Sequence, residues 1–316
     1  MRKLLALAAL ATVGLLLAAC GEGGSDDGGG GESSDLKGTI KIDGSSTVAP
    51  LSTAAAELFQ QENSGVRVTV GTSGTGGGFE KFCAGETDIS DASRPIKQDE
   101  EVPVCKQNGV KFQEIQVAND GLAVVVNKEN DWANCLTVDQ LKKIWDKGSK
   151  VDNWSQVDPK FPDEPLELFG AGTDSGTFDY FTEAINGEEG QSRSDYNATE
   201  DDNVTVRGVS GSKGALGYFG LSYYEQNKDQ LKVVQVDGGE GCVTPTTETV
   251  QSGDYKPLSR PLFIYPSDKA LRRPEVEAFV EFYLDNVATV TEQALFVSLT
   301  DEQLQKSKGN VAQLAQ

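Results

Sequence analysis

From residue 36 onward, strand-like and helix-like patterns alternate along the chain. Short apolar and β-branched runs predict the strands, and the apolar residues between them recur at helical spacing. Thr137 with Gln140 forms a capping box, Pro274 begins an amphipathic stretch, and Thr300 with Gln303 indicates a cap before a last short helix. This alternation predicts an α/β fold in which helices cover both faces of a largely parallel sheet. We expect strands at residues 38–43, 66–70, 122–126, 166–169, 231–236 and 262–265.

Charge and composition exclude several kinds of function. The formal net charge is −21, from 28 basic and 49 acidic residues, which argues against a general nucleic-acid binder because such proteins need a basic face. The chain has no histidine, so a Ser-His-Asp triad, a histidine-ligated zinc and a histidine general base are impossible. Apolar residues make up 37% of the chain, which is enough to form a hydrophobic core.

The first residues have the pattern of an export signal. Arg2 and Lys3 precede an apolar run, and the Leu-Ala-Ala-Cys that ends it resembles a bacterial lipobox. We therefore expect residues 1–19 to be a lipoprotein signal peptide and Cys20 to be lipidated; ordinary cleavage that leaves a free cysteine is the alternative. Residues 20–35 are rich in Gly, Ser, Asp and Glu and predict a lipid-anchored flexible linker. The protein would then lie on the extracytoplasmic face of the cell membrane, in a periplasm or at the outer surface.

Three junctions between a predicted strand and a predicted helix are rich in Gly, Ser and Thr. They lie at residues 43–47, 71–78 and 170–177. Glycine lets the backbone approach a ligand closely, hydroxyls donate hydrogen bonds, and the free amides of a helix start favour negative charge. Such junctions lie at the sheet edge where α/β proteins bind ligands. Together they predict an oxyanion site; the alternative is that their Ser and Thr residues only cap helices.

A further candidate is Arg94, which stands among small residues in the stretch 88–96 and precedes a proline. A guanidinium there is suited to bind two oxygens of an oxyanion at once. The alternative is a surface arginine paired with one of the many carboxylates. Neither a Walker A motif nor a dinucleotide-binding glycine pattern is present, and residues 174–177 resemble an aspartic-protease motif but have no second copy.

The order of these motifs resembles a known family. The lipobox, the Gly-Ser-Ser-Thr-Val-Ala-Pro run at 44–50, the glycine loop before Phe79, the stretch 88–96 and the Thr-Asp-Ser-Gly-Thr-Phe run at 173–178 are arranged as in the phosphate-binding protein of the bacterial high-affinity phosphate ABC transporter. That family implies a two-lobed periplasmic-binding-protein fold with a hinge and a ligand cleft between the lobes. It also implies a solute-binding protein, not an enzyme, that captures inorganic phosphate and passes it to permease subunits. We expect a monomer without metal or cofactor.

The resemblance transfers to individual positions of this chain. One lobe supplies an anion-contacting turn and the hydroxyl of the glycine loop, the other supplies a helix start, and the 88–96 stretch supplies a serine and the guanidinium. The predicted phosphate-binding residues are Ser46, Thr47, Thr75, Ser93, Arg94, Ser175, Gly176 and Thr177.

The chain departs from the family pattern in two ways. Some relatives place a phosphate-binding arginine just before the Ser-Gly-Thr, where this chain has Ala-Gly-Thr at residues 171–173, so Arg94 is expected to replace it. Those relatives also carry an aspartate at the position of Ser93, which accepts the proton of hydrogen phosphate and repels sulfate. The sequence leaves Asp91 or Asp174 as the substitute.

The lobe boundaries follow from the need to bring the three junctions to one cleft. We expect residues 36–119 and 262–316 in one lobe and residues 120–261 in the other, with crossings near Asn119 and Arg260. Four cysteines remain after Cys20, so two disulfides with three possible pairings are expected in an exported protein. Keeping each pair within one lobe favours Cys83 with Cys105 and Cys135 with Cys242.

Two other kinds of function stay open. A protein of the same fold could be a binding protein, adhesin or sensor for another tetrahedral oxyanion, such as sulfate. An enzyme acting on phosphate esters is disfavoured, because such enzymes usually need a metal cluster or an activated nucleophile, and the sequence shows neither histidine nor a carboxylate motif of known spacing.

Overall fold

The computed structural model describes residues 36–314. The predicted signal peptide, the lipidation site Cys20 and the linker lie outside the described residues. Within the described part, no helix is both long enough and apolar enough to cross a membrane.

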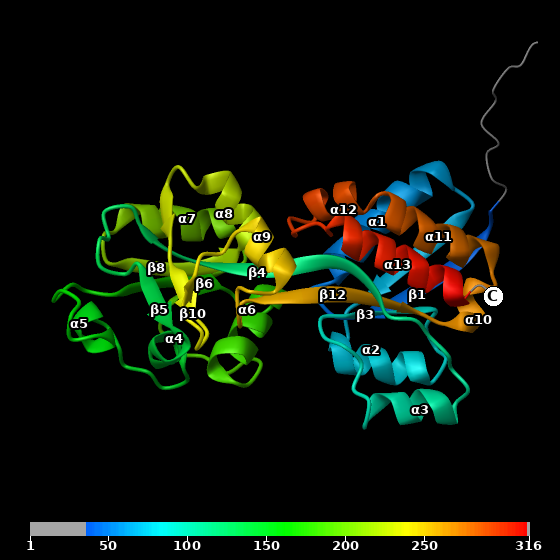
Figure 1. Cartoon of the computed structure of the whole chain (residues 1–316), viewed down its shortest axis with the longest axis horizontal. Coiled ribbons are helices and arrows are strands. Elements are labelled where there is room, and N and C mark those ends of the chain that lie inside the picture. Colours follow the sequence, from blue (N-terminus) through cyan, green and yellow to red (C-terminus); the bar gives the residue numbers. More distant parts are fainter. Residues whose placement is uncertain (1–35, 315–316) are drawn as a thin grey trace, which may run out of the picture. The chain divides into compact units, whose positions relative to one another are not determined.

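Strands and helices alternate through most of the described chain (Figure 1). The strands are β1 (Gly38–Gly44), β2 (Val66–Gly71), β3 (Ile89–Ala92), β4 (Ile115–Asn127), β5 (Cys135–Thr137), β6 (Glu167–Ala171), β7 (Asn197–Thr199), β8 (Ala215–Gly220), β9 (Leu231–Val233), β10 (Gln235–Asp237), β11 (Cys242–Val243) and β12 (Ser259–Pro266). The helices are α1 (Ala49–Glu62), α2 (Gly74–Cys83), α3 (Glu101–Gln107), α4 (Val138–Trp145), α5 (Trp154–Val157), α6 (Gly176–Phe181), the π-helical turn η1 (Thr182–Asn186), α7 (Asp202–Gly211), α8 (Leu221–Asn227), α9 (Thr247–Ser252), α10 (Asp268–Leu271), α11 (Pro274–Asp285), α12 (Val287–Gln293) and α13 (Asp301–Leu314).

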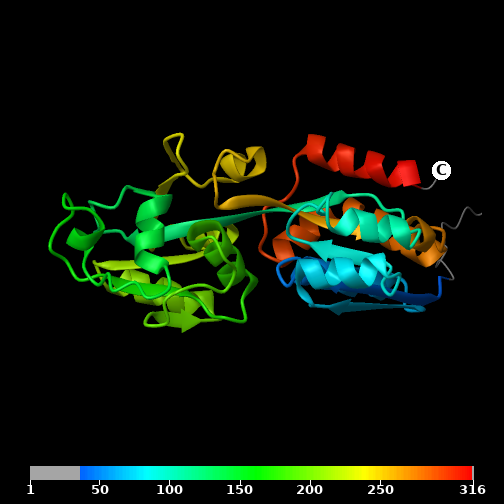
Figure 2. The same ribbon diagram turned by 90° about the horizontal axis from the view of Figure 1, so that it is seen from below.

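Within residues 36–314, the main sheet has nine strands in the order β2-β1-β3-β12-β4-β8-β6-β7, with β9 beside β4; β11, β10 and β5 form a second, small sheet. The expectation of a largely parallel sheet is wrong. Pairs near the two ends of the main sheet are parallel, but β12 is antiparallel to both β3 and β4, and β4 is antiparallel to β8 and β9. The reason is that the chain passes along β4 and returns along β12, so these strands run in opposite directions (Figure 2).

Two large hydrophobic cores flank the region where β4 and β12 pair. Core I gathers buried residues from 40–118 and 262–311, and core II gathers those from 122–258 together with Val297. β4 contributes to both, because Ile115, Val117 and Ala118 lie in core I and residues 122–126 lie in core II. The chain therefore passes from core I to core II in the middle of β4. The division into two lobes about a hinge stays a prediction.

Several expected elements have different bounds in the structure. The segment 231–236 is interrupted and forms β9 and β10, and α2 begins at Gly74 rather than near Phe79. The capping box of Thr137 with Gln140 is confirmed, with the side chain of each residue accepting from the other's backbone amide. The same reciprocal pair forms between Thr300 and Gln303 at the start of α13.

Both expected disulfides are present: Cys83 is bonded to Cys105, and Cys135 to Cys242. The first fastens α2 to α3 within a small third core that contains Phe79, Phe82 and Tyr265. The second joins β5 to β11 at the small sheet beside core II and closes a sequence separation of 107 residues.

Removal of the Cys135–Cys242 disulfide, which closes the longer loop, should lower stability because the unfolded chain gains conformational freedom. We expect Cys135→Ala combined with Cys242→Ala to reduce the free energy of unfolding by about 3–5 kcal/mol. Urea denaturation of the variant and the parent protein measures this difference. Peptide mapping without reductant checks the pairing, and a peptide joining Cys83 to Cys135 would contradict it.

Candidate functional site

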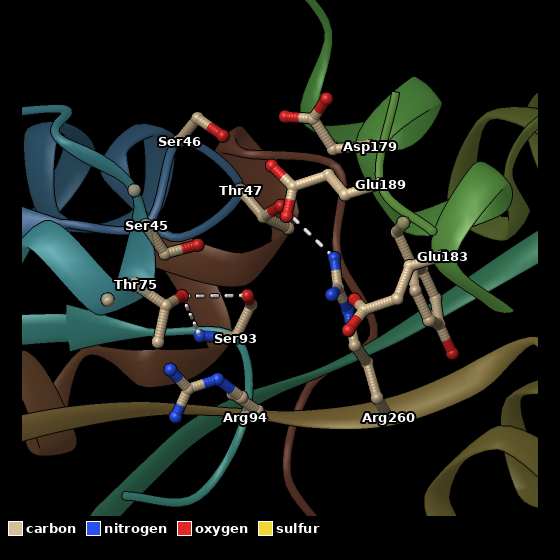
Figure 3. Close-up of a pocket in the computed structure, with 13 residues that line it drawn as sticks. Ser45, Ser46, Thr47, Thr75, Ser93, Arg94, Asp179, Glu183, Glu189 and Arg260 are labelled. Atoms are coloured by element: carbon tan, nitrogen blue, oxygen red, sulfur yellow. Dashed lines mark hydrogen bonds between the residues drawn. The ribbon is translucent and has the colours of Figure 1, made fainter. Parts of the chain in front are cut away.

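A pocket of about 230 Å³ lies between the ends of β1 and β3, the start of α2, β12 and the second half of α6 (Figure 3). Hydroxyls, two guanidinium groups and three carboxylates face it. Its lining residues are Ser45, Ser46, Thr47, Gly74, Thr75, Gly76, Ser93, Arg94, Asp179, Tyr180, Glu183, Glu189 and Arg260. This small polar cavity is therefore lined both by residues from the sequence ranges of core I and by residues from the sequence range of core II.

The first predicted junction lies in this pocket and connects β1 to α1. Gly44 makes the turn possible: its φ is 148°, and a Cβ there would lie 2.1 Å from the carbonyl oxygen of Asp91. The amide of Ser45 donates to that same carbonyl at 2.9 Å. No side-chain cap bond forms at Val48, the N-cap of α1. The hydroxyls of Ser46 and Thr47 therefore do not serve as that helix cap, contrary to the alternative that these residues only cap helices.

The second junction contributes Thr75, in the first turn of α2. Its Oγ1 accepts from the amide of Ser93 at 3.2 Å and lies 3.0 Å from Ser93 Oγ. Ser73, the N-cap of α2, makes no side-chain cap bond either, because its hydroxyl donates to Asp43 at 2.6 Å. Thr75 and Ser93 thus form a hydroxyl pair at the pocket wall, and their contact with phosphate stays a prediction.

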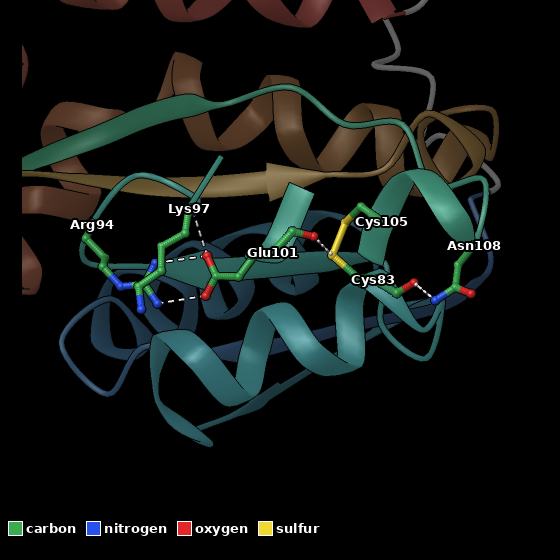
Figure 4. Close-up of a disulfide and its surroundings, with 6 residues drawn as sticks. All are labelled: Cys83, Arg94, Lys97, Glu101, Cys105 and Asn108. Atoms are coloured by element: carbon green, nitrogen blue, oxygen red, sulfur yellow. Dashed lines mark hydrogen bonds and ion pairs between the residues drawn. A yellow bond between two sulfur atoms is a disulfide. The ribbon is translucent and has the colours of Figure 1, made fainter. Parts of the chain in front are cut away.

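Arg94 also lines the pocket, but its guanidinium is already paired (Figure 4). Nη1 and Nη2 donate to the two carboxylate oxygens of Glu101, at 3.0 and 2.7 Å. Glu101 begins α3, the helix that the Cys83–Cys105 disulfide fastens to α2. The Arg94 guanidinium, together with the Lys97 amide, lowers the pKa of Glu101 despite its burial. Both sequence interpretations therefore hold in part, since Arg94 reaches the pocket and is also bound to a carboxylate.

Arg260 is a second cation in the pocket, and the sequence analysis missed it as a site residue. It stands on β12 directly opposite Asp120 on β4, and its Nε donates to that carboxylate at 3.2 Å. Nη2 donates to Thr47 Oγ1 at 3.1 Å, and the guanidinium lies 3.6 Å from the centre of the Tyr180 ring. Arg94 is therefore not the only cation that lines the described pocket. The one available signal was an arginine at the expected crossing point between the lobes.

The third junction contacts the first instead of lining the pocket. The carbonyl of Gly176 accepts from Thr47 Oγ1 at 3.5 Å, and a Cβ on Gly176 would lie 2.7 Å from that oxygen. Ser175 caps α6, since its hydroxyl accepts from the Thr177 amide at 3.1 Å. Ser175, Gly176 and Thr177 are absent from the residues that line the described pocket. For Ser175 the capping alternative applies.

Three carboxylates that the sequence analysis did not name line the pocket, those of Asp179, Glu183 and Glu189. Burial together with the nearby Glu189 raises the pKa of Asp179, against the opposing effects of Arg260 and Ser46. Glu183 and Glu189 are exposed side chains at the same wall. The signal for Asp179 and Glu183 was their spacing of four residues. This spacing places both on one face of a helix, beside the buried Phe178 and Phe181.

Neither aspartate that the sequence left as a substitute lines the pocket. Asp174 is exposed, and Asp91 is fully buried under the first junction. Ser52 donates to Asp91 Oδ1 at 2.8 Å, whereas Oδ2 has no hydrogen-bond partner. Burial raises the pKa of Asp91 to about 8, with a contribution from the nearby Asp43 carboxylate. Asp91 is therefore a neutral acid at pH 7 that supports the loop from beneath.

No cluster of three or more His, Cys, Asp and Glu side chains within residues 36–314 is arranged to hold a metal ion. The pocket offers hydroxyl and guanidinium donors, which suit an oxyanion.

Comparisons with known proteins identify the family. Residues 30–287 match the family model described as a PBP superfamily domain. The chain is 49% identical to Protein SphX of Synechococcus elongatus over 85% of this chain and 80% of that protein. It is 44% identical to the phosphate-binding protein PstS of Staphylococcus saprophyticus over 90% of this chain and 86% of that protein. The chain belongs to the PBP superfamily, in the family of these PstS proteins.

A solved structure confirms the fold. The crystal structure of a possible phosphate-binding protein from Planctomyces limnophilus is 48% identical, covers 89% of this chain and all of that chain, and superposes with a TM-score of 0.85. The mixed α/β architecture described above is thus the periplasmic-binding-protein fold that the sequence resemblance implied.

The buried acid Asp91 should make stability depend on pH. Its pKa is about 8 in the folded protein and about 3.9 in an unfolded chain, so the folded state keeps a proton that the unfolded state loses. This contribution therefore reduces stability as the pH rises from about 4 to about 8. We expect Asp91→Asn, which keeps the acceptor for Ser52, to be more stable than the parent by about 2–5 kcal/mol at pH 8 and nearly equal to it at pH 4.5.

Urea denaturation at both pH values measures the difference, with Asp174→Asn as the exposed control that should show little change. A parent and an Asp91→Asn variant with the same pH profile would show that Asp91 ionises normally.

Proposed function

We propose that this protein captures inorganic phosphate outside the cytoplasm and delivers it to the permease subunits of an ABC transporter. The observation that carries the proposal is the convergence of two guanidinium groups and several hydroxyls on one pocket of about 230 Å³. A tetrahedral oxyanion can accept hydrogen bonds on every face, and this pocket offers donors from several sides. The PstS relatives, which are named for phosphate binding, support the choice of ligand.

The roles of the pocket residues follow from their bonds. Arg260 supplies the main positive charge, because only its Nε donates to the Asp120 carboxylate, whereas both terminal nitrogens of Arg94 donate to Glu101. Ser46, Thr47, Thr75 and Ser93 supply neutral donors. Arg94 shares its charge with Glu101 and contributes less. Binding of this kind needs no bond to be made or broken in the ligand.

The remaining features of the proposal rest on the sequence. The lipobox supports lipid anchoring at Cys20, and the export signal supports a place on the extracytoplasmic face. We include the monomeric state and two lobes that close around the ligand as parts of the same proposal. The contact of Thr47 with Gly176, which joins the first junction to the third, supports closure over the pocket.

Another tetrahedral oxyanion such as sulfate is the second candidate, because Ser93 stands where relatives carry a selective aspartate. Asp179 offers a replacement. It lies at the pocket wall beside Ser46, and its carboxylate can accept the proton that hydrogen phosphate carries and sulfate lacks.

Calorimetric titration with phosphate tests the function and the assignment of the cations together. We expect Arg260→Ala to weaken phosphate binding by about 2–5 kcal/mol, as for a truncated charged hydrogen bond. Arg94→Ala should cost only about 0.5–1.5 kcal/mol, the range of a neutral contact, because both of its terminal nitrogens already donate to Glu101. Arg260→Lys should recover part of the loss, since an ammonium cannot reproduce a planar fork.

The control is Arg207→Ala, which removes the same charge from an exposed position on α7. A parent protein that binds no phosphate would refute the function. Equal effects of Arg260→Ala and Arg207→Ala would remove Arg260 from the site.

Selectivity against sulfate should depend on Asp179. In Asp179→Asn the amide can donate to sulfate, so we expect sulfate affinity to rise at least tenfold while phosphate affinity falls about tenfold, as a charge-assisted hydrogen bond is lost. Competition titrations of the two anions at pH 7 measure the ratio. Glu189→Gln, at an exposed position on the same wall, is the control and should leave the ratio nearly unchanged; the same change in both variants would assign selectivity to net charge alone.

A further inference from the structure

The segment between α12 and α13 connects the two large cores at a place that the sequence did not indicate. Two consecutive residues of this segment pack in opposite directions: Phe296 packs against core I, and Val297 is buried in core II with 6% of its surface exposed. We call residues 295–300 the C-terminal strap. Apart from the strap residue Val297, the described members of core II come from residues 122–258. The strap is thus a third link between the cores, in addition to β4 and β12.

Backbone bonds attach the strap to β4. The amide of Asn119 donates to the carbonyl of Val297 at 2.8 Å, and the amide of Val297 donates to the carbonyl of Asn119 at 3.0 Å. Leu295 begins the strap in a left-handed conformation, with φ of 60°, although it is not glycine. Such a conformation costs free energy and persists only where surrounding contacts enforce it. The amide of Phe296, the next residue, donates to the carbonyl of Thr291 at 2.9 Å, so this turn ends α12 and begins the strap, and the bonds to β4 follow at Val297.

A cluster of side-chain amides reinforces this attachment. Asn119 Nδ2 donates to the carbonyl of Ser298 and to Gln303 Oε1, both at 3.1 Å, and Asn119 is 2% exposed. From α9, Gln251 Nε2 donates to the same Ser298 carbonyl at 2.9 Å. Gln303 Nε2 in turn donates to the carbonyl of Gln251 at 3.1 Å. The cluster therefore joins α13 and the strap to α9, which lies between elements of core II in the sequence.

The amide cluster lies next in the sequence to Asp120, the carboxylate that binds the pocket cation Arg260. Asn119 precedes Asp120, which accepts from Arg260, and on the opposite strand Arg260 precedes Pro261, the partner of Asn119 in the ladder. Arg260 then reaches Thr47, which contacts Gly176. The bonds of the amide cluster and the bonds that close the pocket therefore occur together in one arrangement of the two cores.

We infer that Gln251 and Gln303 are positioning residues for ligand binding, which hold the strap across both cores and favour the arrangement that closes the pocket. This inference rests on the proposed function. Neither residue lines the pocket, so their effect passes through Asn119, β4 and Arg260. Loss of either side chain removes bonds made between the cores and leaves every pocket residue in place. Loss of the Gln303 side chain also removes its capping bond to the Thr300 amide, whereas Gln251→Ala has no such effect on α13. A bound anion should then escape faster.

The test measures release of radiolabelled phosphate from the full chain and from Gln251→Ala, Gln303→Ala and the double variant. We expect each single variant to release phosphate about 3- to 10-fold faster, as for the loss of a net hydrogen bond, and the double variant to do so faster still. The association rate should change less than the dissociation rate. Gln305→Ala is the matched control, because Gln305 is an exposed glutamine on the same helix.

Two readouts separate positioning from a merely structural role. Thermal unfolding reports stability, and small-angle X-ray scattering without phosphate reports the separation of the cores, which should increase in the variants and not in the control. A lower melting temperature with unchanged release and unchanged scattering would overturn the inference. If the parent binds no phosphate, the proposed function fails, and the scattering comparison still decides whether the amide cluster holds the cores together.

Discussion

The ion pair of Arg260 with Asp120 is the interaction on which the site depends. Both side chains are largely buried, with 13% and 5% of their surfaces exposed, and they face each other across the paired strands β12 and β4. Burial raises the pKa of Asp120, and the Arg260 guanidinium opposes that shift. A buried pair of this kind contributes little net stability, but removal of one partner leaves an uncompensated charge. Its value here is geometric, since it fixes a guanidinium where two cores meet.

The contacts of Arg260 explain how an acidic protein can hold an anion. The net charge of −21 affects solubility and the approach of ions from a distance, whereas binding depends on the donors within a few ångströms. The Tyr180 ring stacks against the guanidinium, and the hydroxyl of Thr47 directs one nitrogen to the pocket. In the proposed function, the carboxylates at the pocket wall oppose anions that bring no proton of their own, and so serve selectivity without preventing binding.

Local sequence patterns predicted the site only in part, because the junctions at residues 43–47 and 71–78 supply pocket residues whereas residues 175–177 of the third junction do not line the pocket. Ser46, Thr47 and Thr75 were identified because strand, glycine turn and helix follow one another within a few residues, and the structure places all three in the pocket. Arg260 and Asp179 could not be identified in that way. The position of Arg260 depends on the register of two strands far apart in the sequence, and the exposure of Asp179 to the pocket depends on how α6 packs. The mixed direction of the sheet was missed for the same reason, because the return of the chain along β12 is not encoded in any short segment.

Both guanidinium groups of the pocket are paired with carboxylates of the protein itself. Arg94 is paired with Glu101, which lies seven residues further along the chain at the start of α3. Arg260 is paired with Asp120, which lies opposite it on the neighbouring strand β4. Burial of an unpaired guanidinium is unfavourable because the group loses its hydration, so these carboxylates stabilise the two partly buried cations. An incoming anion must therefore share a cation with a carboxylate that is already bound. Because both cations are partly neutralised, the hydroxyls of the pocket gain relative weight in holding an anion beside the two guanidinium groups.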